Sequence, residues 1–104
     1  MKHKEKKLLG IAKIIRLVKS EDNLVRFLDD ILTESEIDNM HERTKIVACL
    51  KNGLSQRATQ KETEAAIATV SRGANLMQKP KLILDKIVTL AENMAWWNKL
   101  FWRV

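Results

Sequence analysis

The apolar pattern of residues 8–18 constrains the fold of this chain more than any other feature. Apolar side chains recur there at intervals of three and four residues, which is the spacing of one helix face. The face consists of Leu8, Ile11, Ile15 and Val18, widened by Leu9, Ile14 and Leu17. A chain of 104 residues builds one small core and leaves much apolar surface uncovered. So broad a face needs a large partner, and an obligate oligomer would supply one.

The rest of the chain also favours helices. It contains three glycines and one proline, and no alternating run typical of a strand. We therefore predict an all-α single domain over residues 1–104 with six helices. They are expected at about Glu5–Lys19, after Ser20 to Ile31, from the N-cap Thr33 to about Lys51, at Gln56–Thr63 after the N-cap Ser55, from about Ala65 to Gln78, and from Pro80 through Trp97. Asn52-Gly53 is expected to end the third helix, because glycine accepts a left-handed C-cap.

The net charge of +6 is unevenly distributed. Residues 1–20 carry +6, residues 21–42 carry −7 and residues 43–81 carry +6. Such segments could bind a polyanion on one face and repel it on another, but ordinary solvated helix faces carry similar charges. The basic arm, residues 1–7, is expected to be a disordered solvated tail, with nonspecific phosphate contact as its functional alternative.

Several classes of protein and site are excluded. The single Cys49 rules out an internal disulfide framework, fits a reducing cytoplasm and is expected to be a core thiol. His3 and His41 with that one cysteine do not make a zinc site, so no metal or cofactor is expected. No apolar run approaches the roughly 20 residues of a membrane span, and no signal peptide is indicated. The chain has neither a phosphate-cradling glycine loop nor a nucleophile–base pair, so we expect no enzyme.

Residues 55–78 have the organisation of a helix-turn-helix. Two short helices are joined tightly, and small residues precede the second one. Phosphate contacts are expected from Gln56, Arg57, Gln60 and Lys61, and base-edge contacts from Ile67, Ala68 and Ser71. The alternative is two polar surface helices of a bundle, which the pattern alone slightly favours.

Three stretches change that weighting: residues 32–43, Ser55-Gln56-Arg57, and the run IATVSRGAN at residues 67–75. Together they resemble the bacterial tryptophan repressor family, most specifically in the second and third stretches. The resemblance implies an intertwined all-helical homodimer that represses transcription by binding double-stranded DNA at a palindromic operator. The broad apolar faces would then be covered by the second chain.

The resemblance also implies a small-molecule ligand, the amino acid L-tryptophan, acting as corepressor. Arg43 and Arg72 would flank its indole, and one of them would also bind its carboxylate. Gly73 would leave room for the ring, and Thr69, which is also counted among the DNA-binding residues, lies one turn before Arg72. Leu32 and Thr33 of the other subunit would contact its ammonium group. Alternatively, Arg43 is a surface arginine and Arg72 binds phosphate.

Several positions depart from the family pattern. Ala58 replaces a capping-box glutamate, Thr59 and Thr63 replace buried leucines, Glu64 and Ala66 replace the glycines that bracket the turn, and Leu76 replaces a ligand-binding serine. We therefore expect the 55–78 segment either to be mobile without DNA or to form a more continuous helix. Leu76 favours an alternative function, a DNA-binding regulator that uses another ligand or none.

The aromatic tail, residues 96–104, holds four of the five aromatic residues of the chain. Packing of the last helix, with Trp97 and Phe101 one turn apart, is the favoured interpretation. The tail could instead be a patch for a partner protein, and the chain an interaction module that has lost DNA readout. A further alternative is translational, since its three tryptophan codons would slow synthesis when tryptophan is scarce.

Overall fold

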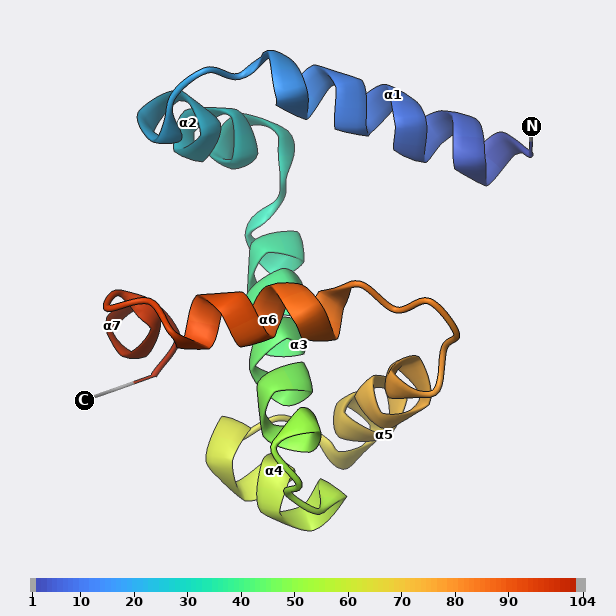
Figure 1. Cartoon of the computed structure of the whole chain (residues 1–104), viewed down its shortest axis with the longest axis vertical. Coiled ribbons are helices and arrows are strands. Elements are labelled where there is room, and N and C mark those ends of the chain that lie inside the picture. The colour runs from blue at the N-terminus through green and yellow to red at the C-terminus, as the bar shows by residue number, and fades with distance from the viewer. Residues whose placement is uncertain (1, 103–104) are drawn as a thin grey trace. The chain divides into compact units, whose positions relative to one another are not determined.

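The computed structural model describes residues 2–102, and its contacts divide the chain into two compact units, one up to Glu34 and one from Ser35. Every regular element among the described residues is a helix, which confirms the all-α class. The helices are α1 (His3–Leu17), α2 (Glu21–Ile31), α3 (Glu34–Lys51), α4 (Gln56–Thr63), α5 (Ile67–Met77), α6 (Leu84–Glu92) and α7 (Trp97–Phe101) (Figure 1). Residues 2–102 thus form seven helices, where six were predicted.

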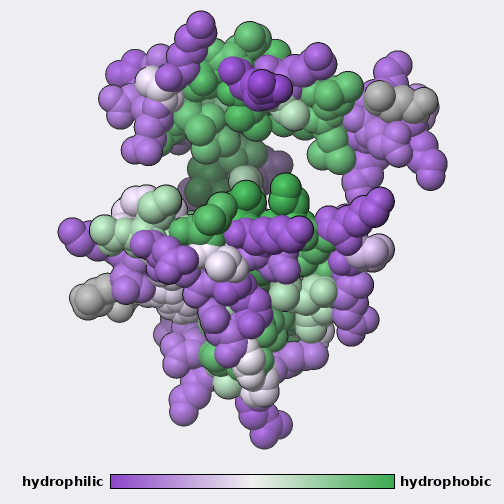
Figure 2. All heavy atoms as spheres, viewed as in Figure 1, coloured by the Kyte–Doolittle hydropathy of each residue, from purple (hydrophilic) through white to green (hydrophobic). Residues whose placement is uncertain are grey.

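The first unit, with α1 and α2, has no core of its own. Neither helix contains a buried residue. Leu8 is 55% exposed and Leu17 is 70% exposed. Hydrophobic surface is visible over these helices in Figure 2. The broad apolar face predicted for residues 8–18 is therefore present, and the first unit does not bury it within itself.

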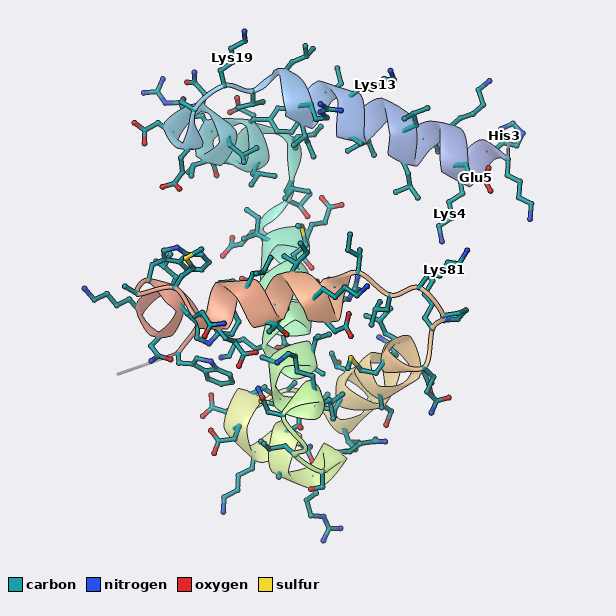
Figure 3. All side chains as sticks on the ribbon, viewed as in Figure 1. His3, Lys4, Glu5, Lys13, Lys19 and Lys81 are labelled. Carbon is teal, nitrogen blue, oxygen red and sulfur yellow. The ribbon has the colours of Figure 1, made fainter. Side chains whose placement is uncertain are left out.

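The expected disordered arm is helical instead. Helix α1 begins at His3, so Lys4 to Lys7 lie in its first turns, and Figure 3 shows Lys4 and Lys13 extending from the ribbon. Lysine is a good helix former, and Glu5 in the first turn interacts favourably with the helix dipole. The first residue of the arm lies outside the described residues.

The second unit is built around the C-terminal half of α3. Ile46 packs with Ala65 and Val70, while Val47 and Ala48 pack with Val88 and Trp97. The buried Trp97 confirms that the tail packs into the core, as favoured; its last two residues lie outside the described residues.

The end of α3 forms a Schellman motif. Gly53 has a φ of +91°. The amide of Leu54 donates to the carbonyl of Cys49 at 3.1 Å, and the amide of Gly53 donates to the carbonyl of Leu50 at 3.1 Å. The predicted C-cap at Asn52-Gly53 is confirmed.

The predicted start of α6 at Pro80 is wrong. Pro80 does not open this helix, because Lys81 adopts a φ of 57° and breaks any helix that would run on from the proline. The helix begins only at Leu84, after Ile83.

The expected continuation of α6 to Trp97 was also wrong. Helix α6 ends at Glu92, and Trp97 begins a separate helix. At this end the Asn93 amide donates to the carbonyl of Thr89 at 3.0 Å, a local bond that competes with helix propagation.

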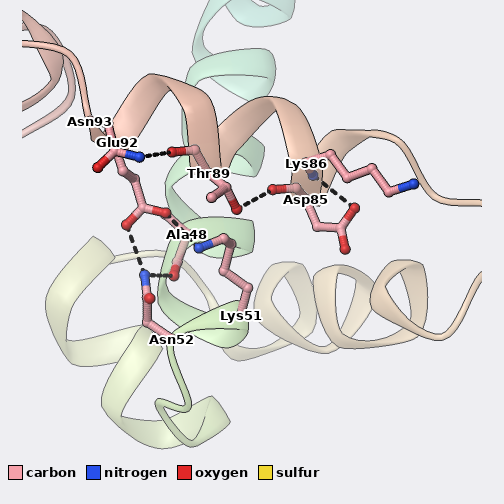
Figure 4. Close-up of polar contacts among 8 residues, drawn as sticks. All are labelled: Ala48, Lys51, Asn52, Asp85, Lys86, Thr89, Glu92 and Asn93. Carbon is pink, nitrogen blue, oxygen red and sulfur yellow. Dashed lines mark hydrogen bonds and ion pairs between the residues drawn. The ribbon is translucent and has the colours of Figure 1, made fainter.

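Polar contacts join the end of α6 to the end of α3 (Figure 4). The ammonium of Lys51 lies 2.7 Å from one carboxylate oxygen of Glu92, and the amide of Asn52 donates to the other at 2.8 Å. The same amide nitrogen donates to the carbonyl of Ala48 at 2.7 Å. Glu92 therefore satisfies groups at the C-terminal end of α3.

Helices α4 and α5 are separate, so the more continuous helix that was one expectation for residues 55–78 is wrong. Ser55 caps α4 by accepting the amide of Ala58 at 3.0 Å. Helix α4 ends at Glu64, whose φ of 60° lies in the left-handed region. That conformation explains why the helix breaks here, although the residue is not a glycine.

Thr59 and Thr63 of α4 both occupy buried positions. Thr63 is 8% exposed, donates its hydroxyl to the carbonyl of Thr59 at 2.7 Å and accepts the amide of Ala65 at 3.3 Å. Thr59 is fully buried, and its own hydroxyl has no hydrogen-bond partner among residues 2–102. An unsatisfied buried hydroxyl destabilises the fold.

The substitution Glu64→Gly should stabilise the second unit by about 1 kcal/mol, because glycine adopts positive φ without a Cβ clash. Urea unfolding at fixed protein concentration measures the change. Glu64→Ala is the control, since it removes the same charge but keeps the Cβ. Equal gains from both variants would mean that charge, not backbone strain, is responsible.

The substitution Thr59→Val should raise stability by about 1 kcal/mol, because it replaces an orphaned hydroxyl with a methyl group of the same shape. Thr63→Val should lower it by a similar amount, because that hydroxyl is hydrogen-bonded. Thermal unfolding of the two variants gives the comparison. A loss of stability in Thr59→Val would show that its hydroxyl has a partner in solution.

Candidate ligand cavity and nucleic-acid face

A cavity of about 330 Å³ lies between α3 and α5. Its lining brings together four of the six residues expected to bind a ligand: Arg43, Thr69, Arg72 and Gly73. Leu76, Asn39 and Ile46 complete it. Helical spacing explains the set, because residues 39, 43 and 46 share one face of α3, and residues 69, 72, 73 and 76 share one face of α5.

The charge of this cavity is positive. Two guanidinium groups, those of Arg43 and Arg72, line it, and the lining contains no carboxylate. Such a pair suits a carboxylate, which arginine binds with two parallel hydrogen bonds, and a flat ring, on which guanidinium stacks. Thr69 and Asn39 add neutral polar groups. Asn39 was missed by the sequence analysis, although it lies one turn before Arg43.

Gly73 has a packing reason as well as the expected ligand role. It is buried, and a Cβ built on it would lie 2.5 Å from Cγ2 of Ile46. Only a residue without a side chain lets α5 approach α3 this closely. The cavity between these helices therefore depends on Gly73 even when no ring occupies it.

Leu32 and Thr33 lie in the first unit, where Leu32 caps the end of α2. The cavity lining comes entirely from the second unit. These two residues therefore line no part of the cavity within this chain, and their expected contact with a ligand remains a prediction that involves a second subunit.

The residues expected to contact DNA lie on α4 and α5. Arg57 and Lys61 of α4 are exposed, and Ile67 at the start of α5 is 48% exposed. Ala68 and Gln56 are also exposed, whereas Gln60, Thr69 and Ser71 are half-buried. The Ser71 hydroxyl donates to Oε1 of Gln56 at 3.0 Å, which links the two helices at this face.

The described residues contain no group of three or more potential metal ligands. None of their helices combines the length and apolarity of a membrane span. Cys49 is buried, and burial, with the nearby Glu62 carboxylate, raises the pKa of its thiol. The core thiol predicted from the sequence is confirmed.

The substitution Gly73→Ala should lower stability by about 1–3 kcal/mol, because the new methyl group forces Ile46 and α5 apart. Ile46→Leu in the same chain removes the Cγ2 methyl group that the new side chain would meet, keeps the side-chain volume, and should recover part of the loss. A double-mutant cycle measured by urea unfolding tests this coupling. Additive effects of the two substitutions would contradict direct contact.

Comparison with known proteins bears on the identity of the chain. No characterised protein and no solved structure matches it. The family model described as Trp repressor protein matches residues 6–91. Because this match covers α2 to α5 and most of α1 and α6, the chain belongs to the Trp repressor family, a regulatory family of DNA-binding proteins.

Proposed function

We propose that this protein is a dimeric, sequence-specific transcriptional repressor that binds DNA through α4 and α5 and uses L-tryptophan as corepressor. One observation carries the proposal: α5 lines the cationic cavity with Arg72 and Gly73 and exposes Ile67 and Ala68 elsewhere on the helix. Family membership supports the DNA-binding part. The operator would be a palindrome, and the protein would act in the cytoplasm.

The cavity supports the ligand part. L-tryptophan would place its indole between the Arg43 and Arg72 guanidinium groups and its carboxylate on one of them. Stacking of this kind contributes about 0.5–2 kcal/mol per cation–ring pair. Thr69, one turn from Arg72, offers a hydroxyl to the same ligand. The ammonium group would meet Leu32 and Thr33 of a second copy.

Coupling between ligand and operator follows from the shared helix. A ligand in the cavity contacts α3 and α5 together and so fixes the position of α5 on α3. Readout in the major groove depends on the placement of the residues at the start of the reading helix. By linkage, DNA binding would tighten tryptophan binding by the same factor.

The uncovered helices support the dimer. Helices α1 and α2 bury none of their residues within the described chain, although α1 alone carries five large hydrophobic residues that are at least 45% exposed. Monomeric proteins rarely expose a contiguous apolar surface of this kind. A second copy would cover it.

Selection of binding sites from a random DNA pool, with and without L-tryptophan, tests the function. We expect one palindromic sequence to be enriched only with tryptophan. On that sequence, fluorescence anisotropy should give an affinity that tryptophan raises by about 5- to 150-fold. Arg72→Ala should bring this ratio close to one.

Two variants sharpen the result. Arg57→Ala should weaken DNA binding both with and without tryptophan, because it removes a phosphate contact. The ratio of the two affinities should stay unchanged. Lys86→Ala on α6 removes one positive charge elsewhere and should change neither quantity. Loss of the ratio in Arg57→Ala would contradict the assigned roles.

The remaining outcomes decide between the alternatives. Equal enrichment in both arms would indicate a regulator that needs no ligand or another one, which the cavity-lining Leu76 favours. Enrichment of no sequence, with weak salt-sensitive DNA binding only, would instead support an interaction module.

A further inference from the structure

A second cavity, also of about 330 Å³, lies on another side of α3. Residues of α3, α4, α6 and α7 line it, among them Cys49, Glu62, Glu92, Trp97 and Trp102. Three of these, Glu92 and the two tryptophans, lie beyond the residues matched by the family model. The family resemblance therefore assigns no role to this cavity.

The charge of the second cavity is negative, opposite to that of the first. Its charged lining residues are Glu62 and Glu92, and the lining contains neither lysine nor arginine. Lys51 compensates Glu92 through the ion pair at 2.7 Å. Glu62 is exposed and forms no ion pair with any residue from 2 to 102, so its carboxylate is accessible to a cation. After burial, Glu62 and more weakly Glu92 raise the pKa of the Cys49 thiol, while Lys45 lowers it.

The aromatic rings of the cavity also suit a cation. Trp97 is 6% exposed and stacks on Phe101 with ring centroids 4.5 Å apart, so its indole is held in a fixed orientation. The ammonium of Lys45 lies 4.5 Å from the centroid of Trp102, which shows that this ring accepts a cation on one face. Indoles attract ammonium ions most strongly among aromatic side chains.

We propose that this second cavity binds a small organic ammonium ion, namely a primary amine that carries a compact apolar or aromatic group. The carboxylate of Glu62 would bind the ammonium, and the indoles of Trp97 and Trp102 would contact the apolar group. An uncharged analogue loses the ion pair and the cation–ring attraction, and an anion is repelled by the Glu62 carboxylate. The first cavity would therefore bind a carboxylate group, and the second an ammonium group.

Fluorine NMR of the full chain labelled with 5-fluorotryptophan tests the proposal. The chain has three tryptophans, and of these Trp97 and Trp102 line the cavity while Trp96 does not. Titration with 2-phenylethylamine should shift the signals of Trp97 and Trp102 in a saturable way and leave that of Trp96 nearly unchanged. 2-Phenylethanol and 3-phenylpropanoate should need at least about tenfold higher concentration to produce the same shift of these two signals.

Variants separate the contributions without disturbing the buried Trp97. Glu62→Gln should weaken the binding of 2-phenylethylamine about threefold to tenfold. The affinity of this variant for 2-phenylethanol should equal that of the unchanged protein. Glu64→Gln removes the same charge outside the cavity and should leave the amine affinity unchanged. Trp102→Leu should lower the affinity for 2-phenylethylamine more than the affinity for 2-phenylethanol.

The opposite results overturn the proposal. Equal affinities for amine and alcohol would show an apolar cavity without charge selection. A parallel, non-saturating shift of all three signals would show adsorption to the surface. Loss of amine binding in Glu64→Gln as large as in Glu62→Gln would show a general effect of net charge.

Discussion

Burial on more than one side of α3 is the constraint on which the second unit depends. A helix that packs on one partner buries one side, yet all four residues from Ile46 to Cys49 are buried. Ile46 faces α5 and the link before it, while Val47 and Ala48 face α6 and α7. Each cavity lies beside one of these contacts, so the packing of α3 also determines which side chains each cavity presents.

Most helix positions could be predicted from local sequence signals at the helix ends. Ser20 and Ser55 accept amides three residues ahead, and Gly53 adopts positive φ, as the chemistry of those residues dictates. One of the errors arises where a residue adopts a conformation that its type does not favour, whereas the early end of α6 accompanies a local side-chain bond of Asn93. Lys81 and Glu64 both have positive φ, which no propensity scale predicts for a lysine or a glutamate, and the first of them displaced the start of α6.

The candidate site was predictable only in part, because some of its residues come together only through contacts between distant segments. Arg43 and Arg72 came from a family resemblance, and the structure places both on one cavity. Asn39 could have been found from the helical spacing to Arg43. The second cavity could not, because its lining joins residues that are up to 54 positions apart, from Ala48 to Trp102, and depends on how α7 returns to α3. Contacts between distant segments have no local pattern.

The gathering of all three tryptophans at residues 96–102 has an optical consequence. Near-ultraviolet emission of the chain comes from one neighbourhood, in which Trp97 stacks on Phe101 and Trp102 lies under Lys45. The lining of the arginine cavity contains no aromatic ring. The chain's own emission therefore reports on the tail side of α3. If a ligand without emission of its own binds between Arg43 and Arg72, any change in this emission is a signal transmitted through the helix.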